Sequence, residues 1–150
     1  MAAVPTSNGA PANPLRAGRC FRVKITDTTI GVFARCSGLQ VEYEVLDYAE
    51  GGQNDFVHKL RGFTRYPNLV LTRGVTSETG LLDWLFQAQE QGQRQTVTIS
   101  LLDEESTTIR AWAFGGAFPV RWIGPTLAGE TNEVASETLE IAHTGLIRRP

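Results

Sequence analysis

Apolar and polar residues alternate along much of this chain of 150 residues, and the pattern predicts a fold built mainly from β-strands. The longest alternation covers residues 39–45, where polar side chains separate the apolar residues Leu39, Val41, Tyr43 and Val45. A period of two over this length is typical of a half-buried β-strand. A second run of mixed character follows a polar stretch, so the simplest interpretation is a long β-hairpin.

The tip of this predicted hairpin, with the sequence YAEGGQND, is polar and rich in glycine. Glycine supplies the positive φ angles that a turn needs. Aromatic residues lie beside charged ones in and around the tip, and we expect a projection of this composition to contact a partner rather than cover a core. The candidate contact residues are Asp47, Tyr48, Glu50, Gly51, Gly52, Asp55, Phe56, His58 and Lys59.

Shorter segments with strand-like patterns predict the rest of the β-structure. Gly115 and Gly116 allow a bulge or corner, and Pro119 indicates an edge or bulge position because proline cannot donate to a strand ladder. A turn is expected at residues 27–29. The predicted strands are residues 19–26, 31–36, 67–71, 94–102, 107–114, 118–123 and 134–144.

One segment, residues 77–91, has helical rather than alternating spacing. Thr76 or Ser77 is the expected N-cap, and Gly92 suits the position after the last helical turn. Aromatic residues widen the apolar surface, so we expect the helix to pack against two surfaces, or against its own sheet and a neighbour. The candidate packing residues are Leu81, Trp84 and Leu85.

The segment 94–102 carries a fully polar face made by Thr96, Thr98 and Ser100. Such a face is expected to contact water. If strands of this kind joined those of identical neighbours in a ring, the sheet edges would be covered and a water-filled lumen would result. These three residues are therefore the candidate lumen-facing residues.

The pattern as a whole predicts about eight strands and one helix, which suggests a β-sandwich or barrel with the helix laid on it. A chain of this length is normally one domain, here residues 15–150. Residues 1–14 are rich in Ala, Pro, Ser, Asn and Gly and are expected to form a flexible arm. An arm that becomes ordered on a neighbouring subunit is the alternative.

Composition excludes several classes of protein. A net charge of −2 with scattered basic residues does not fit a dedicated nucleic-acid binder. The first residues lack the charged and apolar regions of a secretory signal, and no apolar run is long enough to predict a membrane helix. We therefore expect a protein made and kept in the cytoplasm, without a membrane anchor, unless a larger assembly releases it.

No catalytic, cofactor or metal site is predicted. Cys20 and Cys36 are expected to be reduced structural thiols, although either could be drawn with His58 or His143 as a nucleophile and base. The acidic residues 103–105 are expected to form a solvated turn rather than a cation site. Gly51-Gly52 lacks the lysine and the helix of a phosphate loop.

Seven segments in order resemble the tail tube proteins of contractile phages and of phage-like extracellular injection systems. The resemblance covers nearly all of residues 14–147, and no single piece is a catalytic signature. The segments are NPLRAGRCFRVKI, SGLQVEYEVLDYAEGG, KLRGFTRYPNLVLTRGVT, LLDWL, TVTISLLDEE, AFPVRWIGPTL and NEVASETLEIAHTGL.

This resemblance implies a mainly β fold of two packed antiparallel sheets or a split β-barrel, with one flanking α-helix and a long projecting β-hairpin. It implies homo-hexameric rings that stack into a hollow tube inside a contractile sheath, with the hairpin at about residues 45–60 reaching the adjacent ring. DNA or protein effectors would pass through the lumen, and the tube would meet baseplate and tube-terminator proteins. No enzyme activity and no cofactor are implied.

Two alternatives stay open. A tube initiator or terminator ring belongs to the same structural class. A small ligand-binding β-barrel would instead bury the strand faces that are assigned to the lumen, for which threonine and serine are poor apolar liners.

Overall fold

The computed structural model describes residues 20–52, 55–130 and 134–147. The predicted arm, residues 1–14, lies outside these ranges. The described part contains one helix and ten strands, which confirms the mainly β prediction. The elements are β1 (Cys20–Ile25), β2 (Thr28–Phe33), β3 (Arg35–Ser37), β4 (Glu42–Tyr48), β5 (His58–Arg65), β6 (Leu69–Gly74), α1 (Gly80–Gln91), β7 (Gln95–Leu102), β8 (Thr108–Ile123), β9 (Ser136–Ala142) and β10 (Gly145–Ile147).

Eight strands form the body of the molecule, in the order β2-β1-β7-β8-β9-β6-β3, with β10 also paired to β8. Neighbouring strands are antiparallel throughout. The first half of β8 pairs with β7 and its second half with β9, so this one strand belongs to two sheets. The sheets therefore pack as two layers, and the strand order does not close into a barrel.

The bend in β8 occurs where the sequence predicts a corner. Gly116 has a φ of 60°, and a Cβ there would lie 2.6 Å from Thr144 Oγ1. The pairing with β7 shifts register at this point, and the Thr144 amide donates to Gly115 O at 2.9 Å. The two predicted strands 107–114 and 118–123 are consequently one continuous bent strand.

The core lies between the two layers and under α1. From the helix, Leu81 and Trp84 are buried, and Leu85 packs against the core from a half-buried position. Trp84 Nε1 donates to Gln95 Oε1 at 2.8 Å, which ties the helix to the start of β7. The central buried side chains of the strands are Val23, Phe33, Leu69, Leu71, Val97, Ile99, Phe114, Leu139 and Ile141.

The helix begins later than predicted. Its N-cap is Thr79, not Thr76 or Ser77, and the first helical residue is Gly80. Thr76 Oγ1 accepts a hydrogen bond from the amide of Glu78 at 3.3 Å, so this threonine forms a local turn before the helix. The predicted end is confirmed, because Gly92 has a left-handed φ of 60° and its amide donates to Ala88 O.

Other strand boundaries also differ from the prediction. The turn expected at residues 27–29 is displaced, because Thr28 and Thr29 already belong to β2. Thr26 takes the positive φ of 56° that allows the tight connection. Of the last predicted strand, 134–144, residues 136–142 form β9. The separate short strand β10 follows at 145–147, where no strand is predicted.

Candidate assembly surfaces

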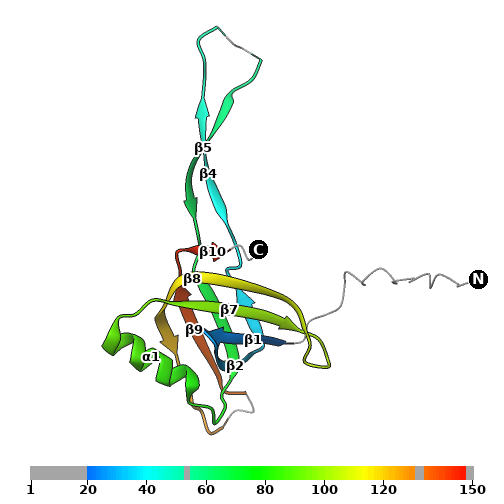
Figure 1. Cartoon of the computed structure of the whole chain (residues 1–150), viewed down its shortest axis with the longest axis vertical. Coiled ribbons are helices and arrows are strands. Elements are labelled where there is room, and N and C mark those ends of the chain that lie inside the picture. Colours follow the sequence, from blue (N-terminus) through cyan, green and yellow to red (C-terminus); the bar gives the residue numbers. More distant parts are fainter. Residues whose placement is uncertain (1–19, 53–54, 131–133, 148–150) are drawn as a thin grey trace, which may run out of the picture.

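The hairpin of β4 and β5 stands apart from the body, as predicted. These two strands form a separate two-stranded sheet and pair only with each other in the described part of the chain. Figure 1 shows the hairpin projecting from one end of the body along the long axis of the molecule. An isolated two-stranded ribbon is marginally stable in water. Within the described residues, the body therefore gives this ribbon no further strand to pair with.

The prediction of a half-buried strand at residues 39–45 is wrong for the single chain. The strand begins at Glu42, and Tyr43 and Val45 are more than half exposed, at 51% and 57%. Only Leu39, before the strand, packs against the core. The alternation in this segment thus belongs to a projecting ribbon whose apolar side chains are not covered by the body.

One face of the ribbon carries an exposed apolar stripe. Leu46 lies opposite Leu60, and Tyr48 lies opposite His58 two residues further along. Because residues two apart in a strand point to the same face, these side chains are neighbours. Leu46, Tyr48 and Leu60 are each about half exposed. Contiguous exposed apolar surface of this kind is typical of protein–protein contact sites.

The opposite face of the ribbon is charged. Lys59 Nζ donates to Asp47 Oδ1 at 3.0 Å, and the Arg61 guanidinium lies 4.2 Å from the centre of the Tyr43 ring. The side chains of Asp47 and Lys59 are 64% and 69% exposed. An exposed ion pair contributes about 0–1 kcal/mol to stability. This pair is therefore better suited to orienting a contact than to holding the chain folded.

The tip combines aromatic and acidic side chains. Phe56 is 54% exposed, and its ring meets that of His58 edge-on with centroids 4.9 Å apart. His58 Nε2 lies 3.6 Å from Glu50 Oε2. Asp55 is exposed, and Gly51 and Gly52 have open space around them, the latter with a φ of 96°. The structure thus brings most of the predicted contact residues together on one projecting surface.

His143 contacts the segment that follows the hairpin, and it is a packed residue rather than the base of a thiol pair, as the sequence interpretation prefers. His143 Nε2 donates to Pro67 O at 2.9 Å, and its ring packs edge-on against Phe114 and beside Tyr66. Nδ1 is buried without a hydrogen-bond partner within the described residues. Burial lowers the pKa of His143, while the hydrogen bond to Pro67 acts in the opposite direction.

The polar face of β7 is partly covered by its neighbours. Thr96 and Thr98 are half-buried, whereas Ser100 is only 6% exposed. Lys24 lies opposite Thr98 and Arg22 opposite Ser100 on the adjacent strand β1. Because paired residues share a face, two basic side chains border the polar stripe. The assignment of this face to a lumen stays a prediction.

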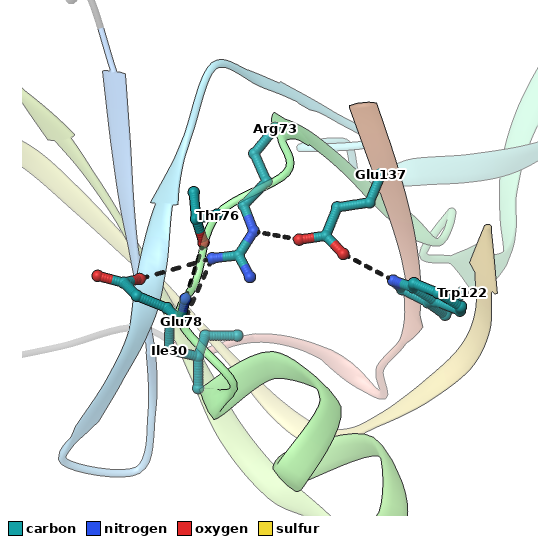
Figure 2. A network of polar contacts seen from close by, with 6 residues as sticks. All are labelled: Ile30, Arg73, Thr76, Glu78, Trp122 and Glu137. Carbon is teal, nitrogen blue, oxygen red and sulfur yellow. Dashed lines mark hydrogen bonds and ion pairs between the residues drawn. The ribbon is translucent and has the colours of Figure 1, made fainter. Parts of the chain in front are cut away.

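A buried polar network connects four strands to the segment before α1 (Figure 2). Arg73 Nε donates to Glu137 Oε1 at 2.6 Å, and Trp122 Nε1 donates to Glu137 Oε2 at 3.0 Å. On its other side, Arg73 Nη1 donates to Ile30 O at 3.4 Å and lies 3.8 Å from Glu78 Oε2. A Cβ at position 31 would overlap Arg73 Nη1, so this network also explains the glycine there.

The described residues contain no group of three His, Cys, Asp or Glu side chains that could hold a metal ion. Cys20 and Cys36 are both free cysteines, and burial raises the pKa of Cys36 to about 11. A thiol with a raised pKa is a poor nucleophile at neutral pH.

Asp103 Oδ1 accepts hydrogen bonds from the amides of Glu105 and Thr107, so this carboxylate organises the acidic turn. No described helix has the length and apolar character needed to cross a bilayer.

Comparison of the sequence with protein families identifies the architecture. The family of the T4-like virus tail tube protein gp19 matches residues 19–147. The chain belongs to this family. The match includes the hairpin, the helix and every strand of the body, which confirms the resemblance found in the seven sequence segments. A search of curated proteins finds none that matches this tail tube family member.

Solved structures of contractile injection systems contain similar chains. A chain of the PVC sheath–tube complex in the extended state, from an extracellular contractile injection system, is 28% identical with a TM-score of 0.78, and 97% of each chain is covered. A chain of the anti-feeding prophage baseplate is 28% identical with a TM-score of 0.74, covering 91% of this chain and 96% of the other. A chain of the PVC sheath/tube terminator is 28% identical with a TM-score of 0.72, covering 91% and 95%.

Proposed function

We propose that this protein is a structural subunit of the inner tube of a contractile tail or injection system. Identical chains would form hexameric rings that stack into a hollow tube, with DNA or protein effectors passing through the lumen and a contractile sheath outside. The family match and the similarity to a chain of the PVC sheath–tube complex support this proposal. On this proposal the protein has no enzymatic role, is assembled in the cytoplasm of the producing bacterium and meets baseplate and terminator proteins.

The projecting hairpin is the observation that carries the proposal. Its apolar stripe of Leu46, Tyr48 and Leu60 is exposed in the single chain, so a partner must cover it for the ribbon to become stable. A neighbouring ring would provide that partner. Each contact is small, but a ring that presents the same contact repeatedly gains strength because each bond is held in place by the others.

Ring formation would use the open strand edges of the body. β2 and β3 end the strand order, and no further strand of the described part pairs beyond them. Unpaired edges are templates for association, and pairing in a closed ring removes them. The polar face of β7, with Thr96 and Thr98 beside Lys24, would then face the lumen.

Removing the tip of the hairpin tests the proposal. Deletion of residues 47–55 is expected to leave the monomer folded, because no described residue of the tip belongs to the core, and to prevent rings from stacking. Circular dichroism would check the fold and negative-stain electron microscopy the assembly. Wild-type protein should form rods, and rods of normal length from the deletion variant would falsify the assignment.

A tube terminator ring is the second candidate, and the similarity to a chain of the PVC sheath/tube terminator favours it. The same micrographs distinguish the two. A tube subunit adds rings without limit and forms long rods, whereas a terminator forms single rings that bind only the end of a rod made by another protein.

A further inference from the structure

A groove of about 610 Å³ lies between the C-terminal end of α1 and the second half of β8. Somewhat more than half of its wall is apolar, from residues that include Leu85, Phe118 and Trp122, and glutamine and arginine side chains supply the polar part. Val120 is 50% exposed, so the groove is accessible from outside the single chain. None of the described hairpin residues of the same chain lines it.

Among the residues that the structure describes, two charged side chains line the groove, and both are basic. The guanidinium of Arg94 lies 5.0 Å from the centre of the Phe118 ring. Arg121 lines the same groove, is 64% exposed, and donates to Glu140 Oε2 at 2.8 Å from Nη2. Because Glu140 already offsets part of the charge of Arg121, Arg94 is the stronger candidate for an incoming carboxylate. A groove with apolar walls and basic residues favours a ligand that combines an apolar group with acidic ones.

We propose that this groove receives the hairpin tip of a second copy of the chain, so that Phe56 enters the apolar part and the acidic residues of the tip meet Arg94. This inference rests on the proposed function, in which the second copy belongs to the adjacent ring, and it names the surface on that ring that the hairpin meets.

Charge complementarity supports this occupant. In the described residues 47–52 and 55–59, three carboxylates (Asp47, Glu50 and Asp55) and one ammonium (Lys59) give a net charge of −2 with His58 neutral. The tip also presents Phe56, which is 54% exposed. The tip thus supplies an apolar group that suits the apolar wall of the groove and carboxylates that suit its arginines.

The placement of the two surfaces supports a contact between copies rather than within one chain. Figure 1 shows the hairpin projecting from one end of the long axis, whereas α1 lies on the body towards the opposite end. The hairpin tip and the helix that borders the groove therefore lie apart on one chain. A contact between different surfaces of identical chains is heterologous, and when it repeats along an axis without closing it builds a linear stack.

Cross-linking between two populations of the chain tests the inference. Both populations carry Cys20→Ser and Cys36→Ser, which remove the native thiols. One population then carries Phe56→Cys in the tip and the other Val120→Cys in the groove. After mixing, assembly and addition of a short thiol-specific cross-linker, a covalent dimer is expected on a denaturing gel.

The matched control replaces Val120→Cys with Leu127→Cys. Leu127 is also an exposed apolar residue, at 83%, but it does not line the groove. The control pair is expected to give no covalent dimer. Equal cross-linking of both pairs, or rods in which neither pair cross-links, would overturn the groove assignment and leave the tube proposal intact. Failure of the wild-type chain to form rods or rings would instead contradict the tube proposal itself.

Charge exchange provides a second, independent measurement. Arg94→Glu is expected to shorten the rods, because an acidic groove repels an acidic tip, and Asp55→Lys alone is expected to do the same. Combining both substitutions in one chain should restore rod length, since the two surfaces are then complementary again. If Arg94→Glu leaves rod length unchanged, or if the combined variant is no better than either single one, the groove is not the receptor.

Discussion

Arg73 and Glu137 are almost fully buried, and their side chains form a hydrogen-bonded ion pair with each other. Their side chains are 3% and 9% exposed, and the carboxylate of Glu137 also accepts from Trp122. Burying a charge is costly unless it is paired and hydrogen-bonded, and both conditions are met here. The pair joins β6 to β9, so it fixes the strand register beneath the segment that leads into α1.

Glu137→Ala is therefore expected to lower the free energy of unfolding by about 3–5 kcal/mol, because Arg73 would keep a buried charge without its counter-ion. Urea unfolding of the monomer measures this. Lys59→Ala is the control, since it removes an exposed ion pair and should cost about 0–1 kcal/mol. Similar losses in the two variants would show that the buried pair does not stabilise the body.

Protonation of His143 is expected to make the stability of the fold depend on pH. Burial places the pKa of His143 below its ordinary 6.5 in the folded chain, so the unfolded chain binds a proton more readily. The contribution of neutral His143 is complete above pH 6.5 and is lost as the pH falls from there towards the lower, folded pKa. The slope for one proton is at most about 1.4 kcal/mol per pH unit.

His143→Gln is expected to reduce this loss of stability between about pH 7 and pH 5, measured by urea unfolding across the range. His58→Gln is the matched control, because His58 lies on the projecting hairpin rather than in the body. If the wild type and the His143 variant have the same pH dependence, protonation of His143 does not destabilise the fold.

At the scale of elements, local sequence pattern predicts those features that are set by the chain's own core. Residues 95–102 alternate because Val97 and Ile99 enter the core, and the helix ends at Gly92 because its left-handed φ favours glycine. The start of the helix is missed, since Thr76 competes with Thr79 for the capping role and only tertiary packing selects between them.

Local pattern is less informative where an element lies outside the core or where its contacts come from distant parts of the chain. The alternation at residues 39–45 is identical to that of a half-buried strand, although the strand here is exposed in the single chain. Arg73 looks like an ordinary residue at a strand end, because its partner Glu137 is 64 positions away and pairs only through the β6–β9 register. The groove beside α1 is equally invisible in the sequence, since residues from the helix and from β8 meet only in the fold.

At the scale of the whole molecule, the chain divides into a body with its own core and a hairpin without one. The body strands bury side chains such as Leu71, Ile99 and Leu139, whereas the paired hairpin strands contribute no member to the core cluster. Segments with few buried apolar contacts open easily and exchange their amide hydrogens quickly. Assembly into stacked rings would slow amide hydrogen exchange only in the hairpin and at the strand edges.

Hydrogen exchange can therefore separate the two parts. In monomer collected by size exclusion, amides of β4 and β5 are expected to exchange rapidly, while those of β7 are protected. In assembled rods, β4 and β5 should become protected because a neighbouring ring covers them, and β7 serves as the internal control that barely changes. If the hairpin is already as protected as β7 in the monomer, it is stable without a partner, and its exposed apolar stripe needs another explanation than stacking.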